Sequence, residues 1–338
     1  MKRSIYPSFR RALLTMAGLC VLISPSLAQH YTVTDLGLLP GGTFSQAAAI
    51  NSLGQITGFA DGPPMSHAFL WTKANGMQDL GALFVSGASW GASINDLGHV
   101  TGGSWIDDVN NAAYLWTAAT GMQSIVPVHD GYGGKSIDNF DQVAGWTTVE
   151  PPEAFVWTKK NGELNLNTLL GGMGSGASGN NDLGQVVGYF QATDGNLHAF
   201  FWTLPSGYED LGEGQATAIN LFGNVVGVNS ANHAFLWTRH NGMQDLGTLT
   251  GDDGSSAAAI NFYGHIVGMS TSNSGSRAFL WNARKGMRDL NTLIPSNSGW
   301  TLWDASGINV FGSIVGTGMI NGQFHAFLLT LTGAAAEE

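Results

Sequence analysis

The chain has 338 residues, of which 11% are charged and 48 are glycine, with one cysteine and a formal net charge of −11. Abundant glycine with few charges is typical of short strands joined by tight turns and excludes a chain of long helices. The negative balance argues against a nucleic-acid partner, and a single cysteine excludes an internal disulfide.

The first 28 residues predict a secretory signal peptide. Four basic residues come first, residues 12–23 are apolar but too short to span a bilayer, and small residues precede a cleavage site near Ala28. Cys20 would leave with this segment, and the remaining nine basic and 24 acidic residues give a net charge of −15. We therefore expect an exported protein, extracellular or periplasmic, and no later segment predicts a membrane span.

A pattern of about 40 residues then recurs seven times. Each copy has a landmark residue at the end of a small-residue run, and these are Asn51, Asn95, Asp138, Asn181, Asn220, Asn261 and Asn309. An aromatic-x-Trp phrase, such as Phe69-Leu70-Trp71, recurs with the same period in six units, and the last unit has Leu329 in place of the tryptophan. The predicted units span residues 38–81, 82–126, 127–168, 169–212, 213–247, 248–292 and 293–331. A fixed period of this size indicates supersecondary units that must stack to bury their apolar faces.

Each unit predicts four antiparallel strands. In the first unit these are residues 47–50, 55–59, 67–72 and 77–80, with a type I turn at residues 51–54 and an Asn75-Gly76 hairpin. No unit contains an apolar run at helical spacing, which argues against a helical solenoid. Four short strands in this length are typical of a propeller blade.

The two ends of the repeat array complement each other. The last unit stops after its third strand, at residues 325–331, whereas residues 31–37 match the fourth strand of the other units. We therefore predict an all-β fold, a seven-bladed β-propeller closed by the N-terminal strand in the last blade, with Val33 beside Phe327. Residues 332–338 would be a short tail, and we expect a monomer.

Charge divides between the two faces of such a ring. Six of the nine basic residues occupy turns between third and fourth strands: Lys73, Lys159, Lys160, Arg239, Arg284 and Lys285. Loops of the opposite face carry Asp61, Asp107, Asp108, Asp130, Glu150, Asp194, Asp252, Asp253 and Asp304. Either turns simply tolerate charge, or the disc is polarised and its acidic loop face attracts cations or a cationic partner.

These repeats resemble the HAF-repeat proteins, a family of bacterial extracellular repeat proteins. The resemblance covers nearly all of residues 31–331 and rests on His-Ala-Phe at 67–69, 198–200, 233–235 and 325–327, with Met-Gln-Asp-Leu-Gly at 77–81 and 243–247. It implies export and a propeller-like repeat, with no catalytic residues to carry over. Ala112, Glu153 and Arg277 replace the histidine in three units.

Aromatic residues that the repeat does not require are the best candidates for ligand binding. They are Trp90, Tyr132, Trp300, Trp303, Trp105 and Trp146. Aromatic rings with a polar edge stack on sugar rings or anchor a protein partner. The alternative is that they plug the channel or pack between loops. The leading hypothesis is a module that binds a glycan or a protein through the acidic loop face.

Two other functions stay open. A carbohydrate-active enzyme could use Asp138 or Asp304, although glycoside hydrolysis wants two carboxylates at a defined separation and no partner is evident. An envelope or matrix scaffold could hold structural calcium at Asp252 and Asp253. The histidines of His-Ala-Phe lie in different units, too far apart to share a metal, and we expect them to be hydrogen-bonded structural residues. No other cofactor is predicted.

Overall fold

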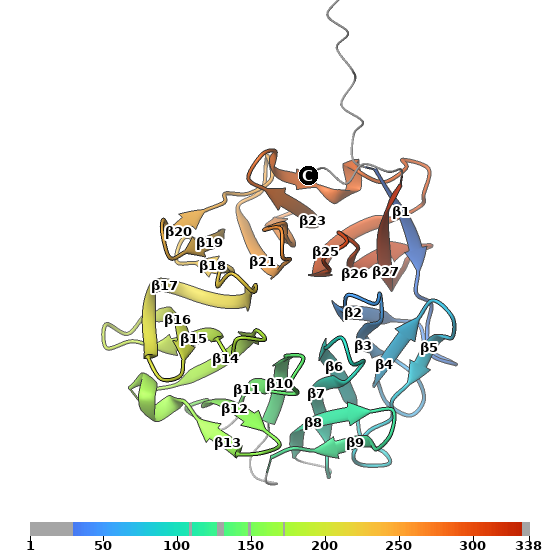
Figure 1. Ribbon diagram of the computed structural model, residues 1–338. Helices are drawn as coiled ribbons and strands as arrows, with labels where there is room; N and C mark the ends of the chain where they lie inside the picture. Colours follow the sequence, from blue (N-terminus) through green and yellow to red (C-terminus); the bar gives the residue numbers. More distant parts are fainter. Residues whose placement is uncertain (1–29, 108–109, 127–131, 148–149, 172, 333–338) are drawn as a thin grey trace, which may run out of the picture.

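The computed structural model describes residues 30–107, 110–126, 132–147, 150–171 and 173–332. The predicted signal peptide, residues 333–338 of the predicted tail, Asp108 and Asp130 lie outside these ranges. The described chain is all-β, and its sheets are arranged around a central axis (Figure 1). No helix among these residues is long and apolar enough to cross a membrane.

Most repeat units form one four-stranded antiparallel sheet each. Unit 1 contains β2 (Ser45–Ile50), β3 (Ile56–Ala60), β4 (His67–Thr72) and β5 (Gly76–Asp79). Unit 2 contains β6 (Ser89–Ile94), β7 (Val100–Trp105), β8 (Asn111–Thr117) and β9 (Gly121–Ser124). Unit 3 contains β10 (Tyr132–Ile137), β11 (Val143–Thr147), β12 (Ala154–Thr158) and β13 (Gly162–Asn165), followed by the 3-10 helix η1 (Asn167–Leu170).

Units 4 and 5 share one long strand and therefore form a seven-stranded sheet. Its strands are β14 (Ser175–Asn180), β15 (Val186–Gln191), β16 (Leu197–Thr203), β17 (Gly207–Ile219), β18 (Val225–Asn229), β19 (Ala234–Thr238) and β20 (Gly242–Asp245). The first half of β17 pairs with β16 and its second half pairs with β18. The connection between these units is short enough for one strand to serve both.

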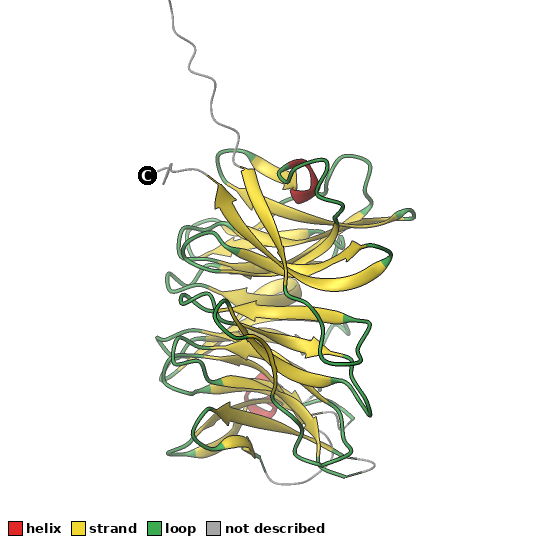
Figure 2. Cartoon of the chain, turned by 90° about the vertical axis from the view of Figure 1, so that its right-hand side faces the viewer, coloured by secondary structure: helices red, strands yellow, loops and turns green. Residues whose placement is uncertain are grey.

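Units 6 and 7 form the last two sheets along the chain. Unit 6 contains β21 (Gly254–Ile260), β22 (Ile266–Ser272), β23 (Gly275–Asn282) and β24 (Gly286–Asp289), and the 3-10 helix η2 (Leu290–Thr292) follows. Unit 7 contains β25 (Thr301–Ile308), β26 (Ile314–Ile320) and β27 (Gln323–Thr332), with β1 (His30–Asp35) beside β27. Seen from the side, the loops gather on two opposite faces of the disc (Figure 2).

Aromatic side chains of the third strands form the core. The residue at the Phe69 position is at most 1% exposed in every unit, as seen for Phe69, Tyr114, Phe155, Phe200, Phe235, Phe279 and Phe327. In each unit the glycine seven positions after the landmark residue faces the first strand so closely that a Cβ would come within about 2 Å of a carbonyl oxygen. Only glycine fits that approach, which explains why it recurs.

Strand β1 pairs with β27 in the last sheet. Asp35 lies opposite Phe327 and Val33 opposite Leu329. The expected pairing of Val33 with Phe327 was therefore wrong by two residues, because β1 adopts the repeat's own register, in which Asp79 lies opposite Phe69. Serine side chains also join adjacent units, and Ser45 Oγ accepts from Ala326 N at 2.9 Å and donates to Gly37 O at 2.7 Å.

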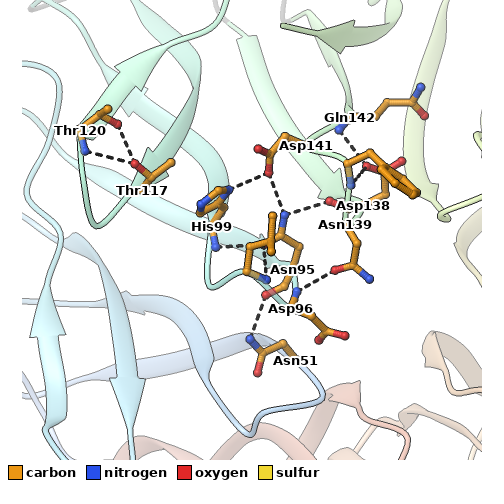
Figure 3. A network of polar contacts seen from close by, with 12 residues as sticks. Asn51, Asn95, Asp96, His99, Thr117, Thr120, Asp138, Asn139, Asp141 and Gln142 are labelled. Carbon is orange, nitrogen blue, oxygen red and sulfur yellow. Dashed lines mark hydrogen bonds and ion pairs between the residues drawn. The ribbon is translucent and has the colours of Figure 1, made fainter.

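The landmark residues form a belt of hydrogen bonds around the axis. Each asparagine Oδ1 accepts backbone N–H groups two and four residues later, which is the predicted turn chemistry, as Asn51 does from Leu53 and Gln55. Each amide also donates to the carbonyl of the next landmark residue, and Asn309 donates to Asn51 at 3.1 Å. Only Asp138 cannot donate, so the belt lacks one bond (Figure 3).

Candidate functional site

A cavity of about 390 Å³ opens on the axis at the end where the first strands begin. Every first strand carries a β-bulge three residues before its landmark residue, as between Ala47 and Ala49. In six units the bulged residue lines this cavity, and these residues are Ala48, Ala92, Lys135, Ser178, Thr217 and Ser306. Five of them are small or neutral, so Lys135 is the one charged side chain in this set.

Lys135 lies against one of the predicted ligand-binding tryptophans, Trp146. Its Nζ is 4.3 Å from the centroid of the Trp146 ring, a cation–π distance. Burial lowers the pKa of Lys135. No carboxylate within the described ranges pairs with this ammonium group, so an anionic ligand group could compensate its lost hydration.

Trp90 and Trp146 line the same cavity, together with Phe59 and Gln46. The Trp90 ring lies over Gly103 of β7, where an added Cβ would come within 2.0 Å of Trp90 Cζ2. The glycine thus makes room for the ring beside the axis. Two of the six predicted aromatic residues therefore meet in one cavity, which lies at the end of the ring that carries the acidic loops.

Trp300, Trp303 and Trp105 do not line it. Trp303 packs edge-on against Phe324 at 4.9 Å, and Trp300 packs in the same manner against Phe327 at 6.1 Å. Both rings support the last unit. Trp105 ends β7, close to Gly87 of the loop before β6. Tyr132 begins β10 opposite Thr147, and its side chain lies outside the described part of the structure.

The two catalytic candidates lie at opposite ends of the inner strands. Asp138 directly follows the first strand of unit 3, and its Oδ1 accepts from Phe140 N and Gln142 N at 2.9 and 2.8 Å. Asp304 lies five positions before its own landmark residue, and burial raises its pKa to about 6. At about 3.3 Å per residue the two are more than about 10 Å apart, beyond the separation that glycosidase carboxylates require.

One of the two calcium candidates, Asp252, faces a cation that the chain itself supplies, and no ion pair is found for the described Asp253. Asp252 Oδ1 is 2.8 Å from the guanidinium of Arg277, which also reaches Asp289 at 3.2 Å. Burial alone would raise the pKa of Asp252, but Arg277 holds it below its usual value. Asp252 is therefore already neutralised. A different group, Asp194, His198 and Glu213, brings one possible metal ligand from each residue within 4.8 Å of the others.

The histidines of His-Ala-Phe are hydrogen-bonded structural residues, as predicted. In each case Nδ1 meets the aspartate of the neighbouring fourth strand at 2.9–3.0 Å, as in His67–Asp79, His198–Asp210, His233–Asp245 and His325–Asp35. Where the histidine is replaced, Glu153 accepts from Asn165 and Arg277 pairs with Asp289. The sites lie in separate units and do not combine into one metal centre.

Sequence reasoning missed Lys135. A comparison of the units at the position three residues before the landmark residue would have found it. That comparison gives alanine, serine or threonine in six units and lysine in one. The sequence therefore shows that unit 3 has a lysine at this position. It does not show that the β-bulge turns the lysine side chain toward the axis.

No protein-family model matches the chain, and no curated protein matches it. Solved structures do resemble it. Streptogramin B lyase has a TM-score of 0.55 at 10% identity, covering 90% of this chain and 98% of that one. Virginiamycin B lyase from Staphylococcus aureus has a TM-score of 0.55 at 11% identity, covering 90% and 100%. At such identity the likeness shows a common β-propeller-like fold and nothing about activity.

Proposed function

We propose that this chain is an exported, closed seven-bladed β-propeller that binds an acidic carbohydrate in its axial cavity. The seven copies of one four-stranded pattern support the blade number, since β17 serves two units. The pairing of β1 with β27 and the bond from Asn309 to Asn51 support closure. The predicted signal peptide supports export, and the His-Ala-Phe motifs support placement among the HAF-repeat proteins.

The observation that carries the binding function is the grouping of Trp90, Trp146 and Lys135 in one cavity. Tryptophan faces stack on the apolar faces of sugar rings, and a buried ammonium prefers a ligand carboxylate or sulfate. A cavity of about 390 Å³ also falls within the range of small-ligand sites. The acidic loops of the same face oppose the approach of any anion, so the attraction of Lys135 would act only at short range, inside the cavity.

Oligosaccharides of a uronic acid and of the matching neutral sugar, titrated by calorimetry, test this proposal. We expect the acidic oligosaccharide to bind more tightly than the neutral one. Lys135→Met is expected to remove that preference, because it removes the one cation among the described residues that line the cavity. Trp90→Ala and Trp146→Ala are each expected to lower the affinity for both oligosaccharides about tenfold or more, because the stacking contact is lost.

Trp105→Ala is the matched control, since it removes a tryptophan of the same sheet as Trp90 that does not line the cavity. It is expected to leave binding unchanged. Failure of every acidic oligosaccharide to bind would refute the proposed ligand, and an unchanged preference for the acidic oligosaccharide in Lys135→Met would refute the role of the lysine. Binding of a peptide library that depends on the same tryptophans would instead make the cavity a protein-recognition site.

A further inference from the structure

A ring of exposed apolar residues surrounds the axis on the face opposite the cavity. The residue two positions after each landmark residue is large and apolar in all seven units and is 60–77% exposed. We call these residues the apolar crown: Leu53, Leu97, Phe140, Leu183, Phe222, Tyr263 and Phe311. A monomeric protein rarely exposes so regular an apolar group, which marks an interaction site.

The fold does not require apolar residues at these tips. The turn depends on the landmark side chain at its first position and on a left-handed residue at its last, such as Gly54 with φ 76°. The third position points to solvent and would accept any polar residue. Side chains of units 5 and 6 even gather there, with Phe222 and Phe262 rings 4.8 Å apart.

Basic residues surround the crown. Because the strands of a blade alternate in direction, the turn between the first two strands and the turn between the last two lie on one face (Figure 2). Lys73, Lys159, Lys160, Arg239, Arg284 and Lys285 occupy the latter turns. The crown face thus combines apolar tips around the axis with cations farther out.

Five of the six described acids of this face, Asp96, Asp138, Asp141, Asp182 and Glu209, are engaged by the protein itself, and only Glu163 has no hydrogen-bond or ion-pair partner among the described residues. Asp96 accepts from Ser52 N at 2.9 Å, Asp182 from Asn139, Asp141 meets His99 at 2.8 Å, and Glu209 meets Arg239 at 3.1 Å. The acidic loops lie at the other end of strands five or six residues long, roughly 15–20 Å away. That is about two Debye lengths at physiological salt, so their repulsion hardly reaches an object that touches the crown.

We propose that the crown face docks on the surface of an anionic lipid bilayer. The tips would enter the boundary between headgroups and acyl chains, and the outer lysines and arginines would meet lipid phosphates. Seven equivalent tips that interchange leucine, phenylalanine and tyrosine suit a flat, laterally uniform partner better than one shaped pocket. A second copy fits less well, because its basic turns would face basic turns. The cavity stays open to solvent in this orientation.

Co-sedimentation with lipid vesicles tests the proposal on the mature chain. The probes are vesicles of phosphatidylcholine alone and vesicles of equal parts phosphatidylcholine and phosphatidylglycerol. We expect binding to the anionic vesicles, weakened by salt. The combined change Phe140→Ser, Phe222→Ser and Phe311→Ser is expected to lower partition at least about a hundredfold, since three rings no longer leave water. Lys159→Gln, Lys160→Gln and Lys285→Gln together are expected to abolish the preference for anionic lipid.

Met65→Ser with Val85→Ser is the matched control, because both are exposed apolar residues in loops of the opposite face. This variant is expected to bind vesicles as the wild type does. Melting curves are recorded for every variant, so that loss of binding can be told apart from loss of the fold. Absence of vesicle binding, or unchanged binding by the triple serine variant, overturns the proposal. Sedimentation velocity provides a separate arm: self-association that the triple serine variant abolishes, without vesicle binding, would make the crown a dimer interface instead.

Discussion

Replacing Asp138 by asparagine is expected to stabilise this protein, because the change completes the hydrogen-bonded belt. In units 1 and 4 the landmark amide donates to the next landmark carbonyl and also to a glutamine Oε1 four residues on, at 2.7 Å. In unit 3 that glutamine is Gln142, and its Oε1 is buried without a hydrogen-bond partner. The carboxylate of Asp138 can satisfy neither acceptor.

The expected gain follows from the missing bonds. A net hydrogen bond contributes about 0.5–1.5 kcal/mol, and a buried acceptor left without a donor costs about 1–3 kcal/mol. Asp138→Asn is therefore expected to raise the free energy of unfolding by about 1–3 kcal/mol at pH 7, a rise of a few degrees in Tm. Urea denaturation and calorimetry measure both quantities.

The gain is also expected to depend on pH. Burial, with the charges of Asp182 and Asp141, raises the pKa of Asp138 above its ordinary value. Because the pKa of Asp138 is higher in the folded than in the unfolded state, its ionised carboxylate destabilises the fold at neutral pH. This destabilisation decreases as the pH falls and the carboxyl group becomes protonated. The advantage of Asp138→Asn is thus largest at neutral pH and shrinks as the pH falls toward about 4.

Asn51→Asp is the matched control, because it makes the same change in reverse at an equivalent position. It is expected to destabilise the protein by a comparable amount at pH 7, since it removes the bonds to Asn95 O and Gln55 Oε1. No gain from Asp138→Asn, or a gain of equal size at every pH, would refute this reasoning about the belt.

Three further predictions concern other parts of the ring. Asp304→Asn is expected to raise the free energy of unfolding at pH 7 by at most about 3 kcal/mol, because burial raises the pKa of Asp304 from 3.8 to about 6. This gain should disappear as the pH falls from 6 to 4, and a gain that does not depend on pH would contradict the prediction. Removing residues 30–36 is expected to lower Tm sharply and cause aggregation, because β27 becomes an open edge; near-normal melting would argue against closure by β1. Calcium is expected to leave Tm unchanged, because Arg277 already pairs with Asp252; a calcium-dependent rise would restore the scaffold hypothesis.

The sequence by itself determined the features that depend on nearby residues. Turn chemistry at Asn51 and Gly54, the hairpin at Asn75-Gly76 and the repeating aromatic positions indicated four strands per unit, and the matching ends indicated that β1 belongs with β27. These signals are local or periodic, so they survive without coordinates. The structural role of the histidines followed in the same way from their spread over separate units.

Only the tertiary structure decided which residues meet. Trp90 and Trp146 stood out as aromatic exceptions, but Trp300 and Trp303 stood out equally and pack against phenylalanines instead. Lys135 gained its meaning from a bulge that turns it toward the axis, and Asp138 from a belt that spans different units. Contacts between residues some 40 positions apart depend on how units stack, and the repeat period does not encode which side chain of each unit faces its neighbour.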